Sequence, residues 1–128
     1  MESAAEFMDR KRDEFESKKI VKAKDIGRKG WLLFEREAYT FIQQSNLDEK
    51  VFLVERLRLK EIIGKAVHPS SKVGNVVYRI AYYIIAKNGK RNGKWAWGQF
   101  CPFVPQDDFA KLMDKAKNEG TIIDEFPI

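Results

Sequence analysis

The stretch from Val76 to Val104 limits the folds open to this chain more than any other part of the sequence. Its first half, VVYRIAYYIIAK, is dense in the β-branched and aromatic residues that favour strands. The turn sequence Asn88-Gly-Lys-Arg-Asn-Gly93 follows, and KWAWGQFCPFV then returns. Two such runs joined by a short glycine-containing turn predict an antiparallel hairpin. Pro102 places the far end of the second strand at an edge or an exit. The fold must therefore contain an antiparallel sheet.

The position of the turn decides which side chains share a face of this hairpin. If the turn centres on its two middle residues, the residues pair so that their numbers sum to 181. One face then carries Tyr83 and Phe100 among several cations, and the other carries Trp95 and Trp97. Because the second face is larger and uncharged, we expect it to meet the core. A slip of one residue would exchange the two faces.

The part of the chain before the hairpin is less regular. Residues 2–17 carry alternating charges typical of an exposed helix or a partly ordered arm. Residues 18–29 have the composition of a linker, with a short strand at Ile20–Val21 as the alternative. From Trp31 to Ser45 the apolar side chains fall on one helical stripe, which predicts a helix.

Two further segments complete the expected elements. Over residues 51–63, leucines alternate with arginines and lysine, so a strand is favoured over a helix, with a break near Gly64. After Pro105, the sequence predicts a helix that begins at Asp107 and closes at Gly120. Its apolar residues follow the i, i+3, i+4, i+7 spacing of an amphipathic helix.

These elements predict an α+β fold in the order helix, strand, strand, strand, helix. The sheet has three strands, or more, and we expect the helices to pack on one of its faces. A chain of 128 residues is most simply one domain. We accordingly expect a charged N-terminal helix or arm with its linker over residues 1–29, and a single α+β domain over residues 30–128.

The positive charge is concentrated in the middle of the chain. The net charge is +5, but residues 58–94 hold nine Lys and Arg against one acidic residue, Glu61. A local excess of this size favours polyanions, although a basic surface can also serve solubility alone.

This charge distribution, together with aromatic residues beside cations, predicts a small non-enzymatic module that binds nucleic acid through the basic hairpin and its sheet face. The sequence does not distinguish DNA from RNA, or single strands from double strands, as the ligand. The alternative is a protein-interaction or homo-oligomeric module in which the open sheet face is an interface. The expected nucleic-acid-binding residues are Lys65, Lys72, Arg79, Tyr83, Lys87, Lys90, Arg91, Lys94 and Phe100.

Other functions find less support in the sequence. His68 and Cys101 each occur once, which does not suit a zinc site, and no glycine motif fits a phosphate-binding loop. We therefore expect no metal and no cofactor, and catalysis stays uncertain with no residues to assign to it. The apolar runs are short and one cysteine makes no internal disulfide, so we expect a cytoplasmic protein without membrane contact.

Overall fold

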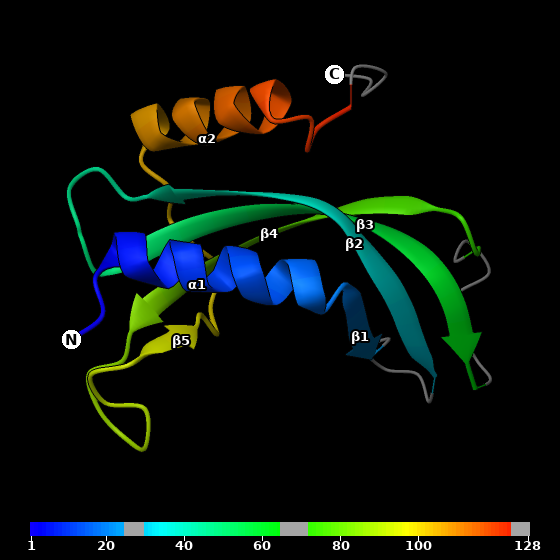
Figure 1. Cartoon of the computed structure of the whole chain (residues 1–128), viewed down its shortest axis with the longest axis horizontal. Helices are drawn as coiled ribbons and strands as arrows, with labels where there is room; N and C mark the ends of the chain where they lie inside the picture. The colour runs from blue at the N-terminus through cyan, green and yellow to red at the C-terminus, as the bar shows by residue number, and fades with distance from the viewer. Residues whose placement is uncertain (25–29, 65–71, 124–128) are drawn as a thin grey trace.

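The computed structural model describes residues 1–24, 30–64 and 72–123. Five strands form one antiparallel sheet in the order β1-β2-β3-β4-β5, so each strand lies beside its neighbour in sequence. Figure 1 shows the curled sheet with one helix from each end of the chain packed on it. The elements are α1 (Ala4–Ser17), β1 (Ile20–Lys24), β2 (Trp31–Gln43), β3 (Lys50–Ile63), β4 (Val76–Ile85), β5 (Trp95–Trp97) and α2 (Gln106–Asn118).

The expected α+β class and antiparallel sheet are confirmed, but the two helices pack on opposite faces of the sheet (Figure 1). The expectation that they share a face is wrong. In β2, Phe41 packs in the α1 cluster and its neighbour Ile42 packs in the α2 cluster. In β3, Leu53 packs in the α1 cluster and Val54 packs in the α2 cluster. Successive side chains of a strand point to opposite faces, so a helix covers each face here.

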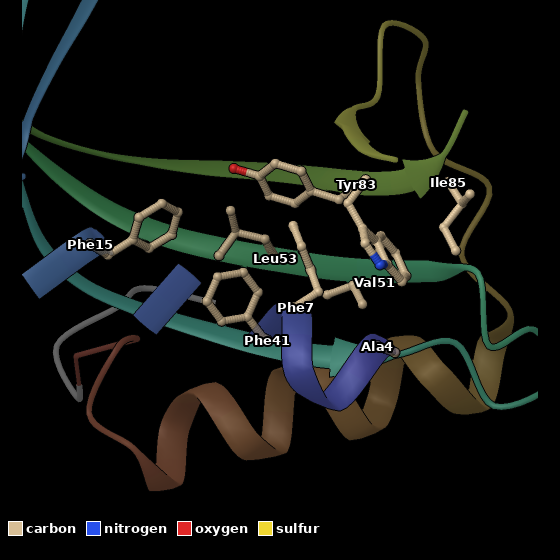
Figure 2. Close-up of a cluster of buried hydrophobic side chains, with 9 residues drawn as sticks. Ala4, Phe7, Phe15, Phe41, Val51, Leu53, Tyr83 and Ile85 are labelled. Carbon is tan, nitrogen blue, oxygen red and sulfur yellow. The ribbon is translucent and has the colours of Figure 1, made fainter. Parts of the chain in front are cut away.

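The core on the α1 side is rich in aromatic residues (Figure 2). Phe7 is fully buried and stacks on Trp95, with 4.6 Å between the ring centroids. Phe15 stacks on Phe41 at 5.5 Å. The helix begins with a capping box, in which the Ser3 hydroxyl accepts from the Glu6 N–H and the Glu6 carboxylate accepts from the Ser3 N–H. The N-terminal helix therefore contributes to a core that it shares with β2, β3, β4 and β5.

The core on the α2 side is smaller. Leu112 and Ala116 of the helix are buried against Phe52 and Tyr82 of the sheet. The expected last helix is confirmed, although it starts at Gln106 after Pro105, which puts Asp107 in its first turn. Gly120 has φ +77, and a residue in this left-handed region ends a helix as the sequence predicts.

The segment from Trp31 to Ser45 is the main correction to the expected elements, because it forms strand β2 and no helix. Both faces of β2 carry apolar side chains, and a shift in pairing between Arg36 and Ala38 breaks the alternation of a regular strand. The apolar positions therefore fall on a helical stripe by coincidence. The neighbouring segment forms the expected strand, β3, which ends next to Gly64 at φ +92.

In the part of the chain that the structure describes, no helix is long and apolar enough to cross a membrane.

Candidate nucleic-acid-binding surface

The β4–β5 hairpin places four expected binding residues at one tip. Lys87, Lys90, Arg91 and Lys94 lie in the loop between the strands, and all four side chains are exposed. Hydrogen bonds from Gly93 N–H to the Ala86 carbonyl (2.8 Å) and from Lys94 N–H to the Arg91 carbonyl (2.8 Å) close the loop. The structure thus gathers four cations on a loop with ordered backbone bonds.

The cations of the tip differ in the ion pairs and hydrogen bonds that they form. Lys87 pairs with Glu49 at 2.5 Å, and the Arg91 guanidinium donates to the Trp95 carbonyl. Lys90 and Lys94 form no ion pair with any described residue. These two lysines are the tip charges most available to a phosphate.

The pairing of the hairpin differs by one residue from the expected pairing. Tyr83 lies opposite Trp97 and Ile85 lies opposite Trp95, so the numbers of paired residues sum to 180. The loop contains an odd number of residues, with left-handed glycines at Gly89 and Gly93, and it centres on one residue instead of two. Trp95 and Trp97 therefore share a face with Tyr83 and Ile85, whereas the expected pairing put Tyr83 on the opposite face from the two tryptophans.

The exposure of Tyr83 and Trp97 is the reverse of what the sequence predicts, although the two residues now lie opposite each other on one face. Tyr83 is buried in the α1 core, so it offers no open surface for stacking. Burial, and to a lesser extent the Glu55 charge, raises the pKa of the Tyr83 phenol to about 12. Trp97 is 42% exposed and packs edge-on against Tyr83 at 5.2 Å. Trp95 is in the core as expected, and its indole Nε1 donates to the Glu2 carbonyl at 3.0 Å.

Arg79 lies beside the exposed indole. Its guanidinium carbon is 4.9 Å from the centroid of the Trp97 ring, within the range of a cation–π contact. The same guanidinium donates to both oxygens of Glu55, at 2.7 and 3.1 Å. Arg36 bonds this carboxylate from the other side at 2.7 Å. Because Arg36 and Arg79 share the single carboxylate of Glu55, these three side chains together keep a net charge of +1 close to Trp97.

The buried Glu55 holds Arg79 in place. Glu55 is fully buried, whereas the Arg79 side chain is one-third exposed, so the arginine joins the interior to the surface. A guanidinium fixed by two hydrogen bonds to a carboxylate loses little freedom when it binds a further group. Arg79 and Trp97 together are called the Arg79–Trp97 platform below.

Beyond Trp97 the chain leaves the sheet, and this places Phe100 elsewhere. The returning strand ends at Trp97, although the sequence predicts it to run to Val104. Gly98 N–H donates to the Tyr82 carbonyl, and the Phe100 N–H lies 3.3 Å from the Tyr82 hydroxyl. Tyr82 belongs to the α2 core, so Phe100 stands on the α2 side of the edge and is 80% exposed. Phe100 and the platform lie on opposite sides of the sheet.

The remaining expected residues lie apart from this surface. Lys72 is exposed in the connection that precedes β4, at the end of that strand away from the tip. A strand of ten residues spans about 33 Å, which separates Lys72 from the hairpin loop. Lys65 lies outside the described residues.

Sequence reasoning missed one feature of the surface and one contact beneath it. It placed Trp97 in the core, because a turn of six residues was expected to centre between its two middle residues. That centre puts Trp97 on the face that was expected to meet the core. Sequence reasoning also left out Lys11 of α1, whose ammonium lies 5.1 Å from the centroid of the Tyr83 ring. No pairing signal within the hairpin could have brought an N-terminal residue to this place.

Among the described residues, no group of three or more His, Cys, Asp and Glu side chains could hold a metal ion. No protein-family model matches the chain, and neither a curated protein nor a solved structure matches it.

Proposed function

We propose that the protein binds single-stranded nucleic acid through the Arg79–Trp97 platform and the basic tip of the β4–β5 hairpin. The observation that carries the proposal is the half-exposed Trp97 with a fixed guanidinium beside it. An exposed indole stacks on a base of any sequence, but only where that base is free of its neighbours in a duplex. Single strands therefore fit this surface better than duplexes.

The charges near the platform support the same ligand. Lys90 and Lys94 at the tip, with the net positive charge around Arg79, supply cations for phosphates along a bound strand. Such contacts release counterions and give an affinity that falls with salt. Neither stacking nor phosphate contacts read base identity, so we expect weak sequence preference. We also propose a cytoplasmic location, because the exposed free thiol of Cys101 suits a reducing compartment.

The test is a titration of fluorescently labelled single-stranded DNA, single-stranded RNA and duplex DNA with the protein, followed by anisotropy at 50 and 200 mM salt. We expect tighter binding of single strands than of duplex, and a clear loss of affinity at the higher salt. No binding of any strand at 50 mM salt, or equal binding of single strands and duplex, would contradict the proposal.

A second candidate function is a protein-interaction or homo-oligomeric module. Phe103 is 91% exposed and Phe100 is 80% exposed, and aromatic residues are enriched at protein interfaces. Sedimentation velocity over a concentration series tests self-association. A dimer that Phe103→Ala dissociates would favour this candidate, and a monomer at every concentration would exclude the homo-oligomer.

A further inference from the structure

The second half of β2 has an edge that no other strand covers. β1 pairs with β2 from Trp31 to Glu35, and the Arg36 N–H still reaches the Lys19 carbonyl at 2.6 Å. From Ala38 to Gln43, β2 pairs with β3 alone among the described residues. Six residues of strand extend about 20 Å, enough to pair with a segment of similar length. An unpaired edge of this kind is a template for a further strand.

Alternation along the ladder identifies the backbone groups that face this edge. The Gln44 N–H donates to the Lys50 carbonyl across the β2–β3 turn, so Gln44 bonds toward β3. In an antiparallel pair the direction of bonding alternates, and Tyr39, Phe41 and Gln43 therefore direct their N–H and C=O groups outward. A contact from α2 supports this assignment. The Lys115 ammonium donates to the Phe41 carbonyl at 2.7 Å, so this carbonyl points away from β3.

The free edge forms the floor of a groove between the two helices. A hollow of about 740 Å³ lies between Met8 of α1, the Phe41–Gln43 end of β2 and the α2 residues around Lys111. A second hollow of about 330 Å³ continues from Phe41 past Tyr39 to Glu119. In Figure 1, the end of β2 lies between α1 and α2. A strand added here would have a helix on each side.

The charges that line the groove indicate which side-chain charge an added strand should have. Around the second hollow, Glu16 stands on α1 and Glu119 follows the end of α2. Arg12, the cation of this hollow, already pairs with Asp9 at 2.8 Å. Glu119 lies 3.9 Å from Lys115, at the limit of an ion pair, and Glu16 forms none among the described residues. This end of the groove therefore has an excess of negative charge.

We propose that this groove binds an extended peptide segment of a partner protein, which adds to β2 as a sixth strand and places a lysine or arginine between Glu16 and Glu119. Main-chain bonds to Tyr39, Phe41 and Gln43 supply affinity that does not depend on sequence. The basic side chain supplies the sequence preference. The groove lies along the edge away from β4 and β5, so this proposal stands independently of nucleic-acid binding.

The probe is a positional-scanning library of acetylated and amidated heptapeptides, followed by hydrogen exchange of the protein with the best binder. We expect Lys and Arg to be selected at one position. In the free protein, the amides of Tyr39, Phe41 and Gln43 should exchange faster than those of Thr40 and Ile42. The bound peptide should slow the first three by at least tenfold. A library without a binder, or a binder that leaves these amides unprotected, would overturn the proposal.

Two substitutions test the same contacts. Gln43→Pro removes an outward N–H and Gln43→Ala keeps it, while both remove the side chain, so their difference isolates the main-chain bond. We expect at least tenfold weaker peptide binding for the proline variant than for the alanine variant. Glu16→Lys should shift the preference of the library away from basic residues. Equal binding by both Gln43 variants, at equal melting temperatures, would exclude strand addition. An unchanged preference in Glu16→Lys would exclude the assigned charge contact.

Discussion

At the scale of single residues, Gly98 lies where the chain leaves the sheet. A Cβ atom at this position would lie 2.2 Å from the Tyr82 ring, far closer than atoms pack. The backbone therefore passes directly over the ring, and the strand ends at Trp97 with one further bond from the Gly98 N–H to the Tyr82 carbonyl. Glycine in a strand pattern marks such close approaches. The sequence offered this signal, but the ring that meets Gly98 could not be identified before the pairing was known.

We predict that Gly98→Ala destabilises the fold by about 1–3 kcal/mol, because the added methyl group must displace the Tyr82 ring or the backbone. Chemical denaturation of Gly98→Ala, Tyr82→Ala and the double variant measures this contact. In the double variant the ring is absent, so alanine at 98 should cost much less than it does in the wild type. Additive effects of the two substitutions would show that the Tyr82 ring is not what the methyl group meets.

The raised pKa of Tyr83 gives a prediction for stability at high pH. Burial raises the pKa from about 10 in the unfolded chain to about 12 in the folded protein. The folded state favours the protonated phenol, so this contribution is complete below pH 10 and is lost as the pH rises toward 12. Tyr39, whose pKa burial also raises to about 12, acts in the same direction.

We expect the free energy of unfolding to fall between pH 10 and 12, and to fall less in Tyr83→Phe. The phenylalanine variant keeps the ring in the core and removes the titrating group. Urea denaturation at pH 8, 10 and 11.5 provides the comparison, with a difference on the order of 2 kcal/mol at the highest pH. Identical pH profiles for the two proteins would mean that Tyr83 ionises normally in the folded state.

At the scale of elements, the sequence predicted a strand or helix correctly where one side of the element is polar or where β-branched residues dominate. β4 and α2 are such elements, and both were recognised. β2 was not, because it is covered on both faces and its bulge near Arg36 shifts the alternation. The predicted pairing of the hairpin was wrong because the sequence does not show the backbone conformation of the turn. Composition locates a turn, but the backbone of its glycines decides whether the loop is odd or even.

The N-terminal helix was predicted as an exposed helix or arm, and its place in the core gives a further prediction. Phe7 is fully buried between Tyr83 and Trp95, so Phe7→Ala should cost about 3–5 kcal/mol of unfolding free energy. Phe103→Ala is the matched control, because the same truncation at a side chain that is 91% exposed should change stability by less than about 0.5 kcal/mol. Similar thermal unfolding of both variants would mean that α1 does not stabilise the sheet.

At the scale of the whole molecule, the meander leaves the two long edges of the sheet with different surroundings. The β4–β5 edge carries the platform and the basic tip, and the β2 edge lies in the groove between the helices. Charge along the sequence predicted the cations that the structure gathers in the hairpin loop. It could not locate the groove, which needs two helices from opposite ends of the chain on opposite faces of the sheet.

The tip charges give a prediction that involves the whole electrostatic surface. Lys90→Ala and Lys94→Ala should each lower the slope of log affinity against log salt by about 0.7 units for a single strand, with equal effects on all sequences. Lys72→Ala, which removes one charge at the other end of β4, should leave the slope for a short oligonucleotide unchanged. An equal effect of Lys72→Ala and Lys90→Ala would mean that only net charge matters.

The most direct test of nucleic-acid binding through the platform is the affinity of Trp97→Ala for a labelled single strand at low salt, beside that of Trp97→Phe. Loss of a stacked base costs about 1–3 kcal/mol, so we predict affinity about five- to 150-fold weaker for the alanine variant. The phenylalanine variant keeps a ring and should lose much less. Melting temperatures establish that both variants are folded. A folded Trp97→Ala protein that binds the single strand as tightly as the wild type would contradict the role of the platform.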